Sequence, residues 1–426
     1  MKKDNYLLYD VNETPPMGKA IIFALQHVLA MFGATILVPI LVNNMAGHEV
    51  LTIPVALFTS GIGTLIYLIC TRGKSPVYLG SSFAFISPMA YAYIASGQSA
   101  VGMGIFITGL VYVLFAILVK IFGHSWIDKL LPPLVIGPMI MIIGLGLAPS
   151  AVSSMGLSGG SFEWKGVLVA VVSFLTTAIV STRAKGILKV IPFLVGIGVG
   201  YVLSIILGIV DFTGIKDASL FSVPKFVIPF KDYAVSFKGI LTIVPIALVT
   251  IAEHIGDHIA LGSIIKKDLV KEPGLEKTLL GDGLATSIAG LLGGPANTTY
   301  GENTSVVGMT KVASVKVIGL GAIFAIIISF LGKISGLLAT IPNPVLGGVS
   351  LLLYGFIAVN GLKVIVQNKI NFDNLKNVIV TSAMLVIGLG GAVISITTKN
   401  VNMSISGMSL AAVVGILLNL LLPDSK

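Results

Sequence analysis

The sequence predicts an all-α polytopic membrane protein. Hydrophobic residues make up 55% of the chain and charged residues 11%, and the mean hydropathy is +1.01. Soluble domains usually carry about 25% charged residues. Apolar runs of about twenty residues, long enough to cross a bilayer as helices, recur along the whole chain. The chain is therefore expected to lie in a lipid bilayer, and we expect no nucleic-acid partner despite the formal charge of +9.

Fourteen transmembrane segments are expected, each centred on one apolar run. They cover residues 17–43, 52–71, 77–94, 100–122, 130–150, 165–182, 187–210, 239–262, 275–293, 296–311, 313–332, 340–361, 375–391 and 404–422. If the N-terminus is inside, 20 of the 27 Lys and Arg residues fall on that same side. An even number of segments also returns the C-terminus to it. The positive-inside rule thus predicts that both termini are cytoplasmic.

Three short patterns recur in the same order at a separation of about half the chain. Gln26-His27-Val28 resembles Glu253-His254-Ile255, and the YLGSS string at 78–82 resembles TYGEN at 299–303. The Pro and two Gly residues at 133, 137 and 144 return at 344, 348 and 355. Since seven is an odd number, two halves of seven segments would have opposite orientations. The chain is therefore expected to contain two inverted repeats of seven, an arrangement found in transporters.

The third and tenth segments are interrupted at corresponding places in the two halves. Residues 76–89 contain Gly80 and three serines, and residues 295–311 contain Gly301, Glu302 and Asn303. Polar, irregular backbone at membrane depth needs protein or a water-filled cavity around it. We expect a short extended piece in each segment, followed by a half-helix whose free N–H groups face the membrane centre. The alternative is a pair of short buried helices with small residues for close packing.

The eighth segment carries a second polar cluster. Glu253 and Asp257 lie four residues apart and share one helix face, and His254 and His258 form a neighbouring pair. Ionisable groups inside a membrane helix are costly and usually functional. Alternatively, Asp257 and His258 lie near the helix end and meet water, an interpretation favoured for His258 and left open for His254. The pattern lacks the HExxH spacing of zinc sites and no serine has a nucleophile-elbow context, so we expect no metal, cofactor or catalytic residue.

The chemistry of these groups indicates a small, polar solute that carries N–H groups. Carboxylates accept hydrogen bonds from N–H groups, helix N-termini donate to carbonyl oxygens, and Phe83 or Tyr354 could stack on a planar ring. A simple anion fits poorly because Glu302 would repel it. A carboxylate could also bind a proton or a sodium ion, so transport is expected to be coupled to an ion.

The strings QHVLAMFGATILVP, YLGSSFAFISP, AEHIGDH, NTTYGEN and GGVSLLLYG resemble the nucleobase/ascorbate transporter family of nucleobase–cation symporters. The resemblance covers essentially the whole chain and is strongest to the uracil permease branch. Glu302-Asn303, followed by Thr310-Lys311, is similar to the family signature. A Glu rather than a Gln at its first position resembles the uracil branch more than the purine branch.

The resemblance also implies a domain organisation. After a cytoplasmic tail at 1–16, a core domain would comprise residues 17–122 and 239–332, and a gate domain residues 130–210 and 340–422. The core would move against the gate to expose the site on either side. Small residues at the border between the two domains would permit close, sliding contact, and the candidates are Gly137, Gly144, Gly347, Gly348 and Gly355. Ordinary tight packing explains each of these glycines equally well.

Site residues follow from the resemblance position by position. The implied substrate-binding residues are Glu253, Glu302, Phe83, Gly301, Tyr354 and Ala34. In this set the carboxylates take ring N–H groups, the backbone N–H groups of Phe83 and Gly301 meet carbonyls, Tyr354 contacts the substrate from the gate, and Ala34 packs near the ring. The implied proton-coupling and polar network consists of Asp257, His27, His258 and Asn303.

Two positions depart from the family pattern. Similar uracil permeases can have His where this chain has Asp257, with His258 one step later, and Ser305 stands where Gly is usual. Which group handles the proton is therefore open between Asp257 and His258. Our hypothesis is that Glu253 and Asp257 share one proton, because two nearby buried carboxylates do not easily both ionise.

The sequence as a whole predicts a proton-coupled uracil importer in a bacterial plasma membrane. Its expected partners are uracil, H⁺ and the lipid bilayer, and a homodimer is one assembly that the sequence allows. The alternatives are a purine carrier, for xanthine or uric acid, or an anion carrier of the same fold. A channel or a membrane enzyme is disfavoured.

Overall fold

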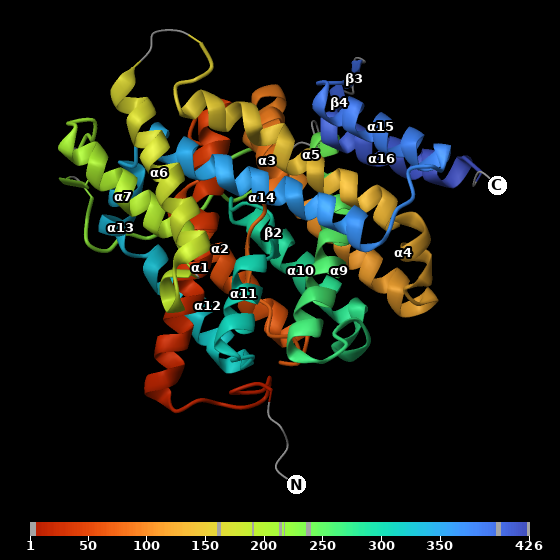
Figure 1. The fold of residues 1–426 in the computed structure, drawn as a ribbon, viewed down its shortest axis with the longest axis horizontal. Helices are drawn as coiled ribbons and strands as arrows, with labels where there is room; N and C mark the ends of the chain where they lie inside the picture. Colours follow the sequence, from red (N-terminus) through yellow and green to blue (C-terminus); the bar gives the residue numbers. More distant parts are fainter. Residues whose placement is uncertain are drawn as a thin grey trace.

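The computed structural model describes residues 6–159, 163–189, 191–212, 215–216, 218–235, 240–397 and 402–423. The first five residues of the predicted tail, and the expected start of the eighth segment at 239, lie outside the described residues. The described chain is mostly helical. Figure 1 shows the helices surrounding a short strand, β2, in the middle of the molecule.

The first half of the chain has helices interrupted by one strand. Its elements are α1 (Met17–Ala46), α2 (Ile53–Cys70), β1 (Leu79–Ser81), η1 (Phe83–Phe85), α3 (Ile86–Phe122), α4 (Ser125–Leu130), α5 (Pro133–Ser154), α6 (Trp164–Arg183), η2 (Gly186–Lys189) and α7 (Pro192–Ile206).

The second half repeats the pattern of helices interrupted by a strand and adds a hairpin. Its elements are η3 (Ile240–Thr242), α9 (Ile246–Ile265), η4 (Val270–Gly274), α10 (Leu275–Leu291), β2 (Asn297–Thr299), α11 (Gly301–Thr310), α12 (Val315–Ser329), α13 (Gly332–Ala339), α14 (Asn343–Gln367), α15 (Leu375–Leu389), β3 (Val393–Thr397), β4 (Asn402–Ser406) and α16 (Gly407–Leu421).

Seven helices of the described residues are long and apolar enough to cross a membrane. Four further apolar helices, α7, α12, α15 and α16, are shorter. The expected third and fourth segments share α3, in which the helix breaks at Gly97 with a φ of 73°, a backbone conformation that glycine adopts readily. The expected seventh segment is shortened to α7 because Pro192 fixes its start. The number of fourteen and the inverted repeat stay predictions.

The helices pack in two groups. α10 packs against α2 and α3, and α12 packs against α1 and α2. In the other group, α14 packs against α5 and α6, and α15 packs against α5 and α16. In Figure 1, α14 crosses the molecule beside α5, while α15 and α16 lie together near the C-terminus.

Four of the five glycines expected at a sliding border instead join helices of the second group, so that expectation is wrong for them. A Cβ on Gly144 would lie 2.3 Å from the carbonyl oxygen of Tyr354, and one on Gly348 would lie 2.1 Å from that of Ala170. Gly137 faces α14 and Gly347 faces α5 in the same way. The physical reason is that each of these contacts joins two helices of the same group, α5, α6 and α14, and does not lie between the two groups. The fifth glycine, at 355, has no neighbour within 4 Å of an added Cβ.

The two expected extended pieces form one antiparallel sheet. Leu79 pairs with Thr299, Gly80 with Thr298 and Ser81 with Asn297. The pairing continues beyond the strands, where Ser82 N donates to the carbonyl of Ala296 at 2.9 Å and Tyr300 N donates to that of Tyr78 at 3.1 Å. The interruptions in the two halves of the chain therefore satisfy each other's backbone.

Side chains from neighbouring helices bind the outer edges of this sheet. Ser60 Oγ donates to the carbonyl of Leu79 at 2.7 Å, and Leu79 N donates to Thr64 Oγ1 at 3.0 Å. On the other strand, Asn297 Nδ2 donates to the carbonyl of Ala285 at 3.3 Å. These contacts with α2 and α10 hold the sheet between two helices.

Tyr300 closes one face of the sheet. Its hydroxyl donates to the carbonyl of Ser81 at 3.0 Å and accepts from Thr35 Oγ1 of α1 at 3.1 Å. Its ring lies directly over Gly80, where an added Cβ would come within 2.3 Å of the ring. Only glycine fits at position 80 with the ring in this place.

The N-terminal segment pairs with the link between α11 and α12. Leu8 N donates to the carbonyl of Lys311 at 2.7 Å, and Ala313 N donates to that of Tyr9 at 2.9 Å. The ring of Tyr6 lies 4.1 Å from both Lys266 Nζ and Lys311 Nζ. The hydrogen bond from Lys311, together with its charge, lowers the pKa of Tyr6. Since Lys266 and Lys311 follow the last residues of α9 and α11, this segment joins the ends of two helices.

Replacing Gly80 with alanine should destabilise the protein, because the new methyl group collides with the Tyr300 ring. Overpacking of this kind costs about 1–3 kcal/mol. The thermal unfolding midpoint of the purified protein in detergent measures the effect. Gly198→Ala in α7 is the matched control, since an added Cβ there meets nothing within 4 Å. Equal midpoints for the two variants would contradict the close packing of Tyr300 on the sheet.

Candidate functional site

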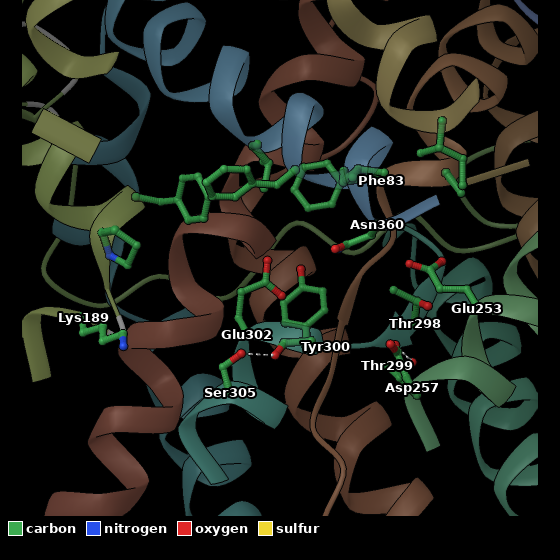
Figure 2. A pocket seen from close by; sticks show the side chains of 18 residues that line it. Phe83, Lys189, Glu253, Asp257, Thr298, Thr299, Tyr300, Glu302, Ser305 and Asn360 are labelled. Carbon is green, nitrogen blue, oxygen red and sulfur yellow. Dashed lines mark hydrogen bonds between the residues drawn. The ribbon is translucent and has the colours of Figure 1, made fainter. Parts of the chain in front are cut away.

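A cavity of about 350 Å³ lies where the two helices that follow the paired strands begin. Its wall includes Phe83 of η1, Gly301 and Glu302 of α11, and Glu253 and Asp257 of α9. Helices α5, α7 and α14 and the short helix η2 supply the opposite wall. The volume is within the usual range of sites for small molecules. Figure 2 shows Glu302 and Tyr300 near the centre of this cavity, with Glu253 and Asp257 to one side.

Glu253 and Asp257 reach the cavity because they occupy one face of α9. Both are half-buried, whereas His254 and His258 on the adjacent face are fully buried. Thr299 at the end of β2 donates a short hydrogen bond from its hydroxyl to Asp257 Oδ2. The sheet therefore holds Asp257 directly, as the dashed line in Figure 2 shows.

Glu253 and Glu302 differ from Asp257 in having no side-chain partner among the described residues. The structure gives neither carboxylate a hydrogen bond to another side chain or an ion pair. A carboxylate that faces a cavity without a partner can accept hydrogen bonds from a ligand, or it can bind a proton. These two groups are the strongest candidates for contact with a solute.

Two helix N-termini complete the polar surface. α11 begins at Gly301 directly after the sheet, and η1 begins at Phe83 and continues into α3. The first N–H groups of a helix have no acceptor within it and carry a partial positive charge. Carbonyl oxygens of a ligand can therefore bind beside the carboxylates. The cavity suits a small neutral ring that has both N–H and C=O groups.

His258 does not meet water, and the interpretation that placed it at an exposed helix end is wrong. α9 continues to Ile265, two turns further, and Tyr67 of α2 covers the imidazole. His258 Nδ1 lies 2.6 Å from the carbonyl of His254, which can only accept, so Nδ1 donates. In a neutral ring Nε2 then accepts, and the Tyr67 hydroxyl lies 2.5 Å from it.

A buried ion-pair geometry lies behind the cavity wall. His254 Nδ1 is 2.8 Å from Asp282 Oδ2, and both side chains are fully buried. The rings of His254 and His258 lie 4.1 Å apart. Neither of these histidines lines the cavity. Both support the face of α9 that carries Glu253 and Asp257.

His27 and Asn303 contact each other and not the cavity. Asn303 Nδ2 lies 3.1 Å from His27 Nδ1 and donates to the carbonyl of His27 at 3.0 Å. Both residues are buried. Because Asn303 follows Glu302, this contact joins α1 to the first turn of α11 and holds Glu302 at the cavity.

Two of the implied binding residues lie outside the cavity wall. Ala34 is 5% exposed and packs in an apolar cluster with Tyr300. Tyr354 is 2% exposed, and its backbone contacts Gly144 of α5. Neither side chain lines the cavity. Their contact with a substrate stays a prediction.

Several lining residues were missed by sequence reasoning. Leu353, Phe356, Ile357 and Asn360 form one face of α14, next to the face that carries Tyr354. Their spacing of three and four residues was a readable signal for such a face. Lys189 of η2 also lines the cavity, although in the sequence it counted only as one of many loop cations.

Comparison with known proteins gives a family and close relatives. A family model described as "Permease family" matches residues 18–397. The chain is 45% identical to the uracil permease of Bacillus caldolyticus and 46% identical to that of Bacillus subtilis, over 98% of this chain and 95% of each relative. It is 42% identical to the uracil permease of Escherichia coli K12, over 96% of this chain and 93% of that protein.

Solved structures with a similar fold are more distant in sequence. The transmembrane domain of a cyanobacterial bicarbonate transporter has a TM-score of 0.66 at 15% identity, covering 96% of this chain and 99% of that domain. The murine Solute Carrier 26 member A9 anion transporter, in its inward-facing state, has a TM-score of 0.67 at 13% identity, covering 96% of this chain and 69% of that one. At these identities the likeness shows the fold alone.

Removing the Tyr67 hydroxyl should destabilise the wall behind the cavity. Tyr67→Phe leaves His258 Nε2 buried without a partner and also removes the hydrogen bond of 2.9 Å between the Tyr67 hydroxyl and Ser75 Oγ. Leaving a buried polar group unpaired costs about 1–3 kcal/mol. Tyr201→Phe is the matched control, because it removes a hydroxyl bound at 2.6 Å to Thr340 at a position that is only partly buried. Thermal unfolding of both variants in detergent measures the difference. If Tyr67→Phe unfolds at the wild-type temperature, the hydrogen bond between Tyr67 and His258 does not stabilise the protein.

Proposed function

The chain belongs to the permease family, and we propose that within this family it imports uracil together with protons. It is a multi-pass membrane transporter and not an enzyme, since the family and the relatives are permeases. The observation that carries the proposal is the pair of unpartnered carboxylates, Glu253 and Glu302, facing the same cavity as two helix N-termini. The uracil permeases similar to this chain support the same substrate.

Uracil offers the groups that this cavity lacks. Its ring carries two N–H donors and two carbonyl acceptors in alternation, and its faces are planar. We assign the N–H groups to Glu253 and Glu302, and the carbonyls to the backbone N–H groups of Phe83 and Gly301. The Phe83 side chain also lines the cavity and can stack on the ring. Ala34 would support the uracil ring indirectly, by packing against Tyr300. Tyr354 would support the face of α14 that lines the cavity.

Coupling to protons is assigned to the α9 carboxylates. Glu253 and Asp257 lie one turn apart and both line the cavity, so one shared proton avoids two adjacent negative charges. Thr299 holds Asp257 at the end of the sheet. Binding of uracil at Glu253 would therefore change the protonation of Asp257. His258, bound to Tyr67 behind the wall, would hold α9 in place rather than carry the proton.

During transport, the two groups of helices would move relative to each other. The core, comprising residues 17–122 and 239–332, carries the sheet and the carboxylates, and the gate, comprising residues 130–210 and 340–422, supplies the facing wall. Movement of one group against the other would open the cavity to each side of the membrane in turn.

The membrane orientation follows from the basic residues. Their excess on the side of the N-terminus supports an orientation with both termini in the bacterial cytoplasm.

Uptake of labelled uracil into vesicles that hold the purified protein tests this function. An inward proton gradient should accelerate uptake by wild type, and Glu302→Gln should reduce it at least about tenfold, because the neutral amide oxygen accepts a hydrogen bond from a ring N–H more weakly than a charged carboxylate does. Ser305→Gly, which replaces a nearby lining side chain, is the control and should keep most of the activity.

Competition for the same uptake separates the alternatives. Excess unlabelled uracil should abolish the signal, while xanthine, hypoxanthine and sulfate should leave it. Inhibition by xanthine would indicate a purine carrier, and inhibition by sulfate an anion carrier. Three carboxylates in the wall disfavour the anion, since like charges repel strongly in a site of low dielectric.

Asp257→Asn tests the assignment of the coupled proton. The wild-type rate of uracil uptake should rise as the external solution is acidified, because the carrier must be protonated to load. In the variant this dependence should flatten, since the amide cannot take the proton. Uptake by Asp257→Asn with an unchanged pH profile would assign the proton to another group. Thr299→Val, which removes only the hydrogen bond to Asp257, should give an intermediate profile.

A further inference from the structure

Of the residues that line the cavity, Lys189 is the one cation. It ends the short helix η2, on the wall opposite the sheet. Across the cavity lie the carboxylates of Glu253, Asp257 and Glu302, and the other titratable side chain of the lining is that of Tyr300. Figure 2 shows Lys189 on one side of the cavity, the α9 carboxylates on the other, and Glu302 between them.

Lys189 differs from the other lysines that have acidic neighbours. Lys74, Lys267, Lys271 and Lys277 each form an ion pair with an Asp or Glu, at 2.7 to 3.6 Å. Within the part of the chain that the structure describes, Lys189 has no such pair, and Glu302 also has none. Two groups of opposite charge type therefore face one cavity, and neither forms an ion pair with a described residue.

The attachment of Lys189 makes its distance from Glu302 depend on domain position. η2 is followed by α7, where the Phe193 ring packs edge to face on Phe356 of α14 at 6.1 Å. The same Phe193 lies close to Gly33 of α1, near enough that an added Cβ there would be 3.8 Å away. Lys189 thus belongs to the gate helices at the place where they touch the core helices. A movement of the gate would carry its ammonium towards or away from Glu302.

After uracil and the proton have left, the site carries negative charge that a cation would stabilise. When uracil leaves, Glu302 loses the N–H group that it binds, and when the proton leaves, the α9 pair gains a negative charge. Carboxylates that are partly removed from water are destabilised unless a cation or donor compensates them. Among the described residues of the wall, Lys189 is the cation that can serve this purpose.

We propose that Lys189 is the counter-charge of the empty carrier: it pairs with Glu302 across the cavity after uracil has left, and this pair lets the unloaded core return. The inference rests on the proposed uracil transport and adds to it a residue of the gate. In the loaded carrier uracil occupies Glu302, so Lys189 is not needed for the step that carries substrate. Net transport and exchange should therefore depend on Lys189 differently.

Two fluxes separate these steps. Net uptake into uracil-free vesicles requires the empty carrier to return, whereas exchange of labelled for unlabelled uracil requires only the loaded form. Lys189→Gln should lower net uptake about fivefold, as expected for loss of a partly exposed ion pair, while exchange stays within about twofold of wild type. Lys189→Arg should restore net uptake. Lys185→Gln, in the same segment but outside the cavity wall, should leave both fluxes unchanged.

The outcomes distinguish this inference from the proposed function. An equal loss of both fluxes in Lys189→Gln would overturn it, because Lys189 would then serve binding or folding. Unchanged net uptake would overturn it as well. A wild-type protein that neither takes up nor exchanges uracil would refute the proposed substrate, and the following measurement then tests the counter-charge alone.

The substrate-free protein gives an independent readout. With Cys70 replaced by serine, Asn360→Cys places a single thiol on the α14 wall of the cavity. If the Lys189–Glu302 pair draws the two walls together, a neutral maleimide should modify this thiol faster once Lys189→Gln is added. Acidification that protonates Glu302 should remove the difference. Equal rates at neutral pH would overturn the proposal whatever the substrate.

Discussion

The pairing of β1 with β2 is the constraint on which the rest of the structure depends. Unpaired backbone N–H and C=O groups are costly at membrane depth, and irregular segments persist there only when protein satisfies them. Here each interrupted segment supplies the partner of the other. Ser60 and Thr64 of α2 bind β1, and Asn297 of β2 donates to α10. The sheet is small, yet it allows two helices to begin inside a membrane protein.

The site follows from where those helices begin. Gly301 and Phe83 start them at one cavity, and the same sheet ends at Thr299, which holds Asp257. Behind this surface, contacts between His27 and Asn303 and between His254 and Asp282 fix the helices that carry the acidic groups. These buried contacts hold the wall through residues other than Glu253 and Glu302, and the two carboxylates face the cavity.

Much of this arrangement could be predicted from local sequence. The polar interruptions around Gly80 and Gly301 and the i,i+4 spacing of Glu253 and Asp257 pointed to the cavity. Pairing between strands more than two hundred residues apart left no local signal, and neither did the burial of His258, which depends on Tyr67 from another helix. The glycines were misplaced because their spacing shows that backbones approach closely, without showing which helix is the neighbour. Lys189 was missed since its role depends on what faces it across the cavity.

A structure determined with uracil bound tests whether the two carboxylates and the two helix N-termini form the binding site. We predict the ring between the two helix N-termini, with its N–H groups within hydrogen-bonding distance of Glu253 and Glu302 and its carbonyls near the backbone N–H groups of Phe83 and Gly301. Uracil bound elsewhere, or bound in this cavity with its N–H groups turned away from both carboxylates, would contradict this prediction.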